Sequence, residues 1–161
     1  MPAFMKLRDI KGEASDTDHQ GWILIDSVTA AIFRSIPTGA KDNQRTKGGT
    51  ILSDLAVSRQ LDKSSTKLME ACANGTFFKE VEIHFCTTVR NKQEPYLMYK
   101  LHDVIISSFD QGAYASGSPL PQETLAMGYS AAEWTYIVVD PKTGDPKGHV
   151  SARYDPGAGR S

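Results

Sequence analysis

The sequence lacks the features of several common protein classes. Its two cysteines, Cys72 and Cys86, are too few for a disulfide framework and are typical of a protein made in a reducing compartment. No run approaches the roughly 18 apolar residues that cross a membrane as a helix, so membrane insertion is not expected. Neither charge sign dominates, because 18 Lys and Arg residues oppose 19 Asp and Glu residues and leave a formal net charge of −1. Nucleic-acid-binding proteins usually carry a marked basic excess, so that partner class is not expected either.

The first ten residues also lack the features of a signal peptide. A secretory leader needs about 7–15 uninterrupted apolar residues, whereas Lys6, Arg8 and Asp9 interrupt this stretch. We therefore expect the protein to fold in the cytoplasm without a signal peptide. The 161 residues, of which 40% are hydrophobic, are enough for one domain with its own core, and we assign residues 1–161 to a single domain.

What the sequence does contain is an alternation of apolar and polar residues with a period of two, the pattern of half-buried strands. Segment 77–89 shows it most clearly. We expect this strand to have an apolar core face and a polar outer face: Phe77, Val81, Ile83, Phe85 and Val89 against Glu80, Glu82, His84, Cys86 and Thr88. Segment 51–61 alternates in the same way. Segments 22–35 and 96–109 are apolar on parts of both faces, which indicates strands that pack on the core and also against something else.

The C-terminal part continues this pattern. Small residues at 130–132 divide the strand pattern of 125–139, which predicts a bulge or bend between two halves. The Pro- and Gly-containing segment 141–146 predicts a turn, and 149–154 predicts a short strand that pairs back as a hairpin.

Helical spacing is confined to one segment, where Leu68, Met69 and Cys72 share a face. Ser64 or Ser65 can cap its start, and Asn74-Gly75 supplies residues that tolerate positive φ at its end. The predicted fold is therefore mainly β: two packed antiparallel sheets in a barrel-like sandwich, with one short α-helix (about 64–74) that closes an open end. Flexible loops are expected at about 37–49 and 112–121, and a frayed tail at 156–161. With Cys72 on the apolar helix face, we expect Cys72→Ser to destabilise the fold more than Cys86→Ser.

Three patterns resemble catalytic or metal sites, and each has a simpler explanation. Ser64-x-x-Lys67 with Lys142-Thr-Gly144 imitates two boxes of serine β-lactamases, but a helix start and a turn explain both. His84 and Cys86 lie two apart on one strand, whereas a structural zinc site needs four ligands. The adjacent His102 and Asp103 point to opposite faces of a strand and cannot form a triad. With no phosphate-binding loop or dinucleotide fingerprint, we predict no enzymatic activity, no cofactor and no metal.

Several ordered segments carry a resemblance to a known family. They are 4–13, His19, 22–27, the helix block 61–75 (Leu-Asp-Lys-Ser-Ser-Thr-Lys-Leu-Met-Glu-Ala-Cys-Ala-Asn-Gly), 101–108 (Leu-His-Asp-Val-Ile-Ile-Ser-Ser), 121–125 and 133–136. Over roughly residues 3–155 the chain resembles the Hcp proteins, which form the inner tube of bacterial type VI secretion systems. The resemblance implies a homohexameric ring with a wide channel, and rings that stack into a tube. It also implies a spike protein, a contractile sheath and effector proteins as partners, and export of the protein itself from the cell.

Two sets of residues are candidates for these roles. Ser27 and Thr29, in the long second strand, are candidates for lining the channel. The loop 37–49 departs from the glycine- and serine-rich segment of many relatives, and its charged residues are candidates for ring stacking: Lys41, Asp42, Arg45 and Lys47. The alternative hypothesis is a monomeric β-barrel enzyme or small-ligand carrier.

Overall fold

The computed structural model describes residues 1–39, 41, 49–113 and 120–156, and these form eleven strands and one α-helix. The strands are β1 (Ala3–Leu7), β2 (Ile23–Ile25), β3 (Ser27–Thr29), β4 (Ile32–Arg34), β5 (Thr50–Leu52), β6 (Leu55–Gln60), β7 (Phe77–Val89), β8 (Lys92–Gly112), β9 (Gln122–Gly128), β10 (Ala131–Val139) and β11 (Pro146–Tyr154). The helix, α2, spans Ser65–Asn74. It is too short and too polar to cross a membrane, and it is the only helix among the described residues.

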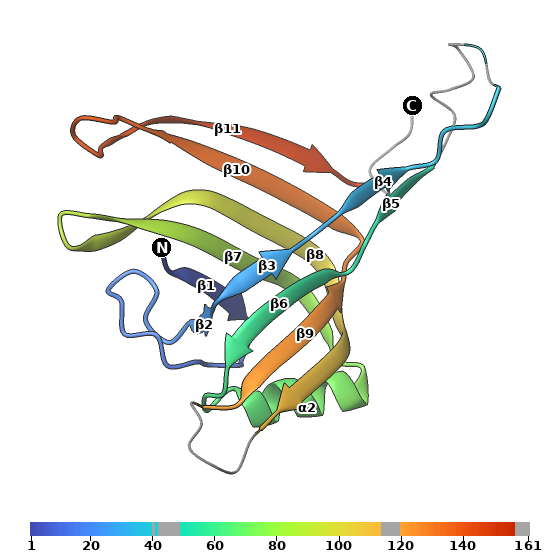
Figure 1. The fold of residues 1–161 in the computed structure, drawn as a ribbon, viewed down its shortest axis with the longest axis horizontal. Helices are drawn as coiled ribbons and strands as arrows, with labels where there is room; N and C mark the ends of the chain where they lie inside the picture. The colour runs from blue at the N-terminus through green and yellow to red at the C-terminus, as the bar shows by residue number, and fades with distance from the viewer. Residues whose placement is uncertain (40, 42–48, 114–119, 157–161) are drawn as a thin grey trace.

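Nine strands form one antiparallel sheet in the order β2-β1-β7-β8-β9-β6-β3, with β10 beside β8 and β11 beside β10. β2 and β3 follow each other in the chain but lie at opposite ends of this order, so the sheet curls back on itself. The closure includes a hydrogen bond from the Asp26 N–H to the Ser58 carbonyl at 2.8 Å. The predicted barrel-like, mainly β fold with one short helix is confirmed, and its facing layers are two sides of the same curled sheet (Figure 1).

The long strand β8 organises the molecule because both of its edges are used. One edge pairs with β7, and the other pairs first with β10 and then with β9. β9 and β10 therefore follow the same edge of β8 and are separated only by Tyr129 and Ser130, which confirms the predicted bend. β10 and β11 form the predicted hairpin, which extends from the barrel (Figure 1).

The core fills the inside of the barrel. In β6 and β9 every second residue is buried, which is the period-two pattern of strands with one inward face. The fully buried side chains include Met5, Ile23, Leu55, Val57, Ile83, Leu101, Leu125 and Met127. Helix α2 covers one end of the barrel (Figure 1) and inserts Leu68, which is fully buried.

The helix ends differ in how well the sequence predicts them. Gly75 adopts the left-handed conformation (φ 61°) and ends the helix, as predicted. Ser64 occupies the N-cap position, but its side chain makes no capping hydrogen bond. Instead its N–H and hydroxyl both donate to the Asp62 carboxylate. The predicted cap is therefore wrong in its chemistry, because Ser64 serves a buried polar network.

The predicted core face of β7 is wrong at its start. Phe78 is buried, whereas Phe77 is 58% exposed. The opposing strand contains the cause: Asp103 has a left-handed backbone (φ 54°) between the residues that pair with Phe78 and Glu80. This kink changes which positions of the two strands face inward, and single-sequence alternation does not reveal it.

The two cysteines are also placed differently from the prediction. Cys86 is fully buried, whereas Cys72 is half-buried. Segment 11–22 folds over the outer face of β1 and β7 and forms a second small core there, in which Cys86 packs with Phe4, Ala14 and Trp22. Burial raises the pKa of the Cys86 thiol to about 12.

Candidate functional surfaces

A face of small side chains covers one outer side of the barrel. The registers β3–β6 and β6–β9 align two rows across three strands: Ser27–Ser58–Thr124 and Thr29–Ala56–Ala126. Directly paired residues point to the same side of a sheet, and in β6 and β9 these positions alternate with buried core residues. We call these six residues the small-residue face. The face is built from hydroxyls and methyl groups and carries no bulky side chain.

Polar groups lie both within the small-residue face and beside it. Ser27 Oγ lies 2.6 Å from Ser58 Oγ, and Ser107 Oγ donates to Asp54 at 2.5 Å. Asp110, next to Thr124 in the β8–β9 register, extends the first row with a carboxylate. The hydroxyl groups of such a face can form many weak hydrogen bonds to another molecule.

Both predicted channel candidates lie on this face, and both are exposed. Of the predicted stacking residues, Lys41 is exposed. Asp42, Arg45 and Lys47 lie outside the described residues, as do most of the loop 37–49, most of 112–121 and most of the tail.

A second surface is the arm formed by β4 and β5. Among the described strands these two pair only with each other, and they project from the barrel (Figure 1). Several large apolar side chains here are strongly exposed: Ile32 55%, Phe33 58% and Ile51 59%, with Ile36 just beyond β4 at 56%. A lone two-stranded hairpin is marginally stable in water, so this arm is expected to pack against another surface.

A third surface is the flap formed by β10 and β11. Here β11 pairs only with β10, so among the described strands its outer edge is free. Tyr136 and Val150 pair across the flap and are 51% and 65% exposed, and Val138 is 40% exposed. In register with Tyr136, the row continues to Leu97 of β8 and Phe85 of β7. The apolar stripe of the core thus continues beyond the barrel, where this chain leaves it uncovered.

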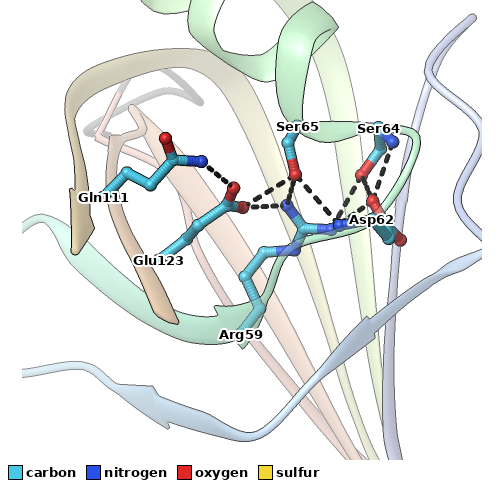
Figure 2. A network of polar contacts seen from close by, with 6 residues as sticks. All are labelled: Arg59, Asp62, Ser64, Ser65, Gln111 and Glu123. Carbon is cyan, nitrogen blue, oxygen red and sulfur yellow. Dashed lines mark hydrogen bonds and ion pairs between the residues drawn. The ribbon is translucent and has the colours of Figure 1, made fainter. Parts of the chain in front are cut away.

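Beneath helix α2 lies a buried ionic centre, shown in Figure 2. Arg59 of β6 points into the barrel end and is fully buried. Its Nη1 donates to Glu123 Oε2 at 2.5 Å, and its Nη2 donates to Ser64 Oγ at 2.9 Å and also pairs with Asp62. Ser65 Oγ donates to Glu123 at 3.0 Å. We call these five residues the Arg59 centre.

The Arg59 centre joins β6, β9 and the start of α2, and it explains the Leu-Asp-Lys-Ser-Ser block as structure. Gln111 of β8 also donates to Glu123, at 2.8 Å. Two carboxylates, those of Asp62 and Glu123, pair with the guanidinium, and a buried charge requires such a partner. Sequence reasoning missed Arg59 and Glu123. The alternation of apolar and polar residues places each of them at an inward position of its strand, where a charged residue is unusual, and this could have identified them.

The residues that resembled catalytic sites are separated by the fold. Ser64 is buried in the Arg59 centre, whereas Lys67 is exposed and pairs with Glu70 at 2.8 Å. Lys142-Thr-Gly144 lies in a turn, as predicted. His102 contacts Glu133 at 2.9 Å, whereas Asp103 accepts from Ser130 at 2.7 Å.

His84 and Cys86 do not form a metal site in the described part of the chain, where no cluster of three or more ligating side chains has the required arrangement. Instead His84 Nδ1 lies 3.0 Å from His19 Nε2. Sequence reasoning set His19 aside as a metal ligand because it has no paired spacing with another histidine, and otherwise used it only for the family resemblance.

The sequence and the fold agree with those of known proteins. Residues 4–136 match the family model described as "Type VI secretion system effector, Hcp". The chain belongs to the Hcp family. It is 24% identical to Protein hcp1 of Pseudomonas aeruginosa over 134 residues, which cover 83% of this chain and 81% of that protein. A solved structure described as that of a type six secretion system protein is 26% identical, with a TM-score of 0.87 and coverage of 96% of this chain and 95% of that one.

Hcp1 from Salmonella typhimurium shares the fold, with a TM-score of 0.74, 21% identity and coverage of 96% of this chain and 93% of that one. The predicted family is thus confirmed. This Hcp-family chain is a type VI secretion system tube or effector protein, and its family is structural and not enzymatic. Proteins of the family are secreted through the type VI system.

Proposed function

We propose that this Hcp-family chain forms hexameric rings that stack into the inner tube of a type VI secretion system. The observation that carries the proposal is the pair of unpartnered apolar surfaces, the arm and the flap, on a chain of this family. Two different surfaces that fit each other make a head-to-tail contact, and such a contact closes into a ring when its rotation closes. The arm of one copy packs on the flap of the next.

The closed ring resolves two problems that the single chain has. It covers the apolar side chains of the arm and the flap, and it removes the free edge of β11 from solvent. A contact of this kind is repeated six times, so a modest energy at each interface becomes a large energy for the whole ring.

In this ring the small-residue face lines the channel, with Ser27 and Thr29 toward the cargo. Hydroxyl and methyl groups hold a polypeptide by many weak contacts, which allows it to be carried and then released. The partners are a second ring, a spike protein, a contractile sheath and effector proteins, and the tube protein leaves the cell with its cargo.

For stacking we propose the loop 37–49, in which Lys41, Arg45 and Lys47 outnumber Asp42. Exposed ion pairs are individually worth about 0–1 kcal/mol, but a ring repeats each of them six times. Replacing residues 38–48 with a short Gly-Ser turn is expected to leave rings intact and to shorten the stacks seen by electron microscopy. Stacks of parental length would exclude the loop from stacking.

Cross-linking tests the arm–flap contact directly. Phe33→Cys and Val150→Cys are combined in a Cys72→Ser background and oxidised. We expect a ladder of covalent species that ends at six chains, while Phe33→Cys alone forms no ladder. Monomers alone after oxidation of the double-cysteine protein would contradict the arm–flap contact.

Labelling tests the channel face. In a Cys72→Ser background, Thr29→Cys is coupled to a maleimide gold cluster. Lys100→Cys serves as the matched control, because it lies on the outer side of the barrel at β8, away from the small-residue face. Electron microscopy of Thr29→Cys rings should place the gold on the inner wall, and gold on the outer rim would contradict the assignment.

A further inference from the structure

Two histidines on different parts of the chain form one hydrogen-bonded row. His19 belongs to segment 11–22 and is 1% exposed; its Nδ1 lies 2.7 Å from Asp16 Oδ1. Its Nε2 lies 3.0 Å from Nδ1 of His84 on β7, and His84 Nε2 lies 3.6 Å from Glu82 Oε2. We call Asp16, His19, His84 and Glu82 the histidine clasp, because these four residues link segment 11–22 to the sheet.

Aromatic rings enclose the clasp. Phe4 stacks on His19 with centroids 4.3 Å apart, and Trp22 contacts both histidines, at 4.9 Å from His19 and 4.6 Å from His84. Trp22 is therefore a built-in reporter of this contact. If the two imidazoles separate, Trp22 loses at least one of its ring contacts.

The charged groups around the clasp are few. Besides its own two carboxylates, Lys6 lies 5.6 Å from the centroid of Trp22, and both Lys6 and Lys100 act on Glu82. Cys86 Sγ lies 3.9 Å from His19 Nε2. Burial, and then the charges of Asp16 and Glu94, raise the pKa of this thiol to about 12, so it stays neutral.

Both carboxylates of the clasp stay ionised at neutral pH. The hydrogen bond from His84 lowers the pKa of Glu82 against a smaller effect of burial. For Asp16, burial raises the pKa, but the hydrogen bonds from His19 and the backbone outweigh it, and the net shift is downward.

The row accommodates a limited number of protons. The ionised Asp16 requires a proton on His19 Nδ1, and the N···N contact between the rings requires one hydrogen between two nitrogens. With these two protons both imidazoles are neutral. One further proton, on His84 Nε2, can be accommodated, because this nitrogen can then donate toward Glu82. A second further proton places hydrogens on both facing nitrogens, and two donors 3.0 Å apart repel each other.

We propose that the histidine clasp is an acid-sensitive switch that holds segment 11–22 on the sheet at neutral pH and releases it when both histidines are protonated. Histidine is the side chain whose ordinary titration falls between about pH 5 and 8. Acidification in that range breaks the ring-to-ring hydrogen bond and uncovers the small core around Phe4 and Cys86. The barrel itself has its own core and stays folded.

Fluorine NMR of the assembled protein labelled with 5-fluorotryptophan tests the switch. The chain has two tryptophans, and the Trp134→Phe variant assigns the two resonances. Between about pH 8 and pH 4.5 we expect the Trp22 resonance to move to a solvent-exposed position and the Trp134 resonance to stay. Circular dichroism over the same range should show a constant β signal.

Two variants separate the switch from a general effect of acid. His84→Gln can still donate to His19 but does not titrate, so the acid response of Trp22 should disappear. His102→Gln removes a different histidine–carboxylate contact and should respond like the parent. A Trp22 resonance that stays constant in the parent, or that still moves in His84→Gln, would overturn the proposal.

Discussion

At the scale of single residues, the most costly feature of the fold is the buried guanidinium of Arg59 at the barrel end. Arg59 and Glu123 are 0% and 1% exposed, and the Arg59 Nε atom has no hydrogen-bond partner among the described residues. The other hydrogen-bonding groups of the Arg59 centre pair with one another across β6, β9 and the start of α2. The centre therefore fixes where helix α2 begins relative to the sheet, at the cost of keeping a guanidinium out of water.

Removing one charge from this centre is expected to be strongly destabilising. Arg59→Met leaves the Glu123 carboxylate buried and unbalanced, so the free energy of unfolding should fall by about 3–5 kcal/mol. Arg59→Met combined with Glu123→Leu should recover a large part of this loss. Urea denaturation measures both, with Lys67→Ala as a control, because its exposed ion pair should contribute far less to the free energy of unfolding. Equal losses for Arg59→Met and Lys67→Ala would contradict the role of the centre.

The two thiols should differ in reactivity and in tolerance. Cys86→Ser puts a hydroxyl in a buried site among Phe4, Ala14 and Trp22 and should cost about 1–3 kcal/mol, more than Cys72→Ser. In the native protein Cys72 should react with a thiol reagent well before Cys86, which is buried and has a raised pKa. Mass spectrometry of the labelled peptides identifies the order, and prior labelling of Cys86 would show that segment 11–22 does not cover it.

Acid stability should depend on Glu133. A hydrogen bond from His102 holds the pKa of Glu133 below its usual 4.5. A carboxylate with a depressed pKa stabilises the fold above its ordinary pKa, and this contribution is lost as the pH falls through the lower, folded-state value. Glu133→Gln should therefore reduce the fall in unfolding free energy between about pH 5 and pH 3, measured by urea denaturation. The exposed Glu13→Gln is the control, and equal slopes for Glu133→Gln and the parent would contradict the prediction.

At the scale of elements, helix α2 depends on one side chain more than on its caps. Leu68 is fully buried against the barrel end, whereas its neighbour Met69 is 40% exposed. Leu68→Ala should leave a cavity and lower the free energy of unfolding by about 2–5 kcal/mol. Met69→Ala, measured in the same denaturation series, should cost under about 1 kcal/mol. Similar losses for the two variants would mean that the helix packs on the barrel by another face.

The strand elements also show how far sequence reasoning reaches. The Pro- and Gly-containing turn at 141–146 predicted the β10–β11 hairpin, whose second strand is exposed along most of its length. Alternation predicted β7 with its bounds, because that strand has one face toward the core. It failed at Phe77, where a left-handed residue in the neighbouring strand changes the inward face. Alternation failed again at Cys86. The pattern indicates a polar, exposed face there, but segment 11–22 covers that face and buries Cys86. Both failures arise from contacts between distant segments, which a single strand's pattern does not contain.

The functional surfaces were predicted unevenly for the same reason. Ser27 and Thr29 were placed in a strand by their neighbours, and the structure adds that Ser58 and Thr124 continue the row across two further strands. The apolar arm was not predicted, because the alternation of 51–61 pointed to one core strand, whereas the structure divides it into β5 and β6.

At the scale of the whole molecule, this Hcp-family chain combines a closed barrel with two appendages that it does not cover itself. The barrel buries its own apolar core and pairs its own buried charges. The arm and the flap do not, and they differ in shape, so they suit a head-to-tail contact between copies. A monomeric carrier would have no use for either surface, and this distinguishes the tube from the alternative hypothesis.

The mass of the particle in solution tests this account most directly, by light scattering coupled to gel filtration. Six copies of the 17.6 kDa chain predict a particle of about 106 kDa. Phe33→Asp, which puts a charge in the arm contact, should reduce the mass toward that of one chain without changing the circular dichroism spectrum. A parent protein that elutes with the mass of a single chain at every concentration would contradict the account.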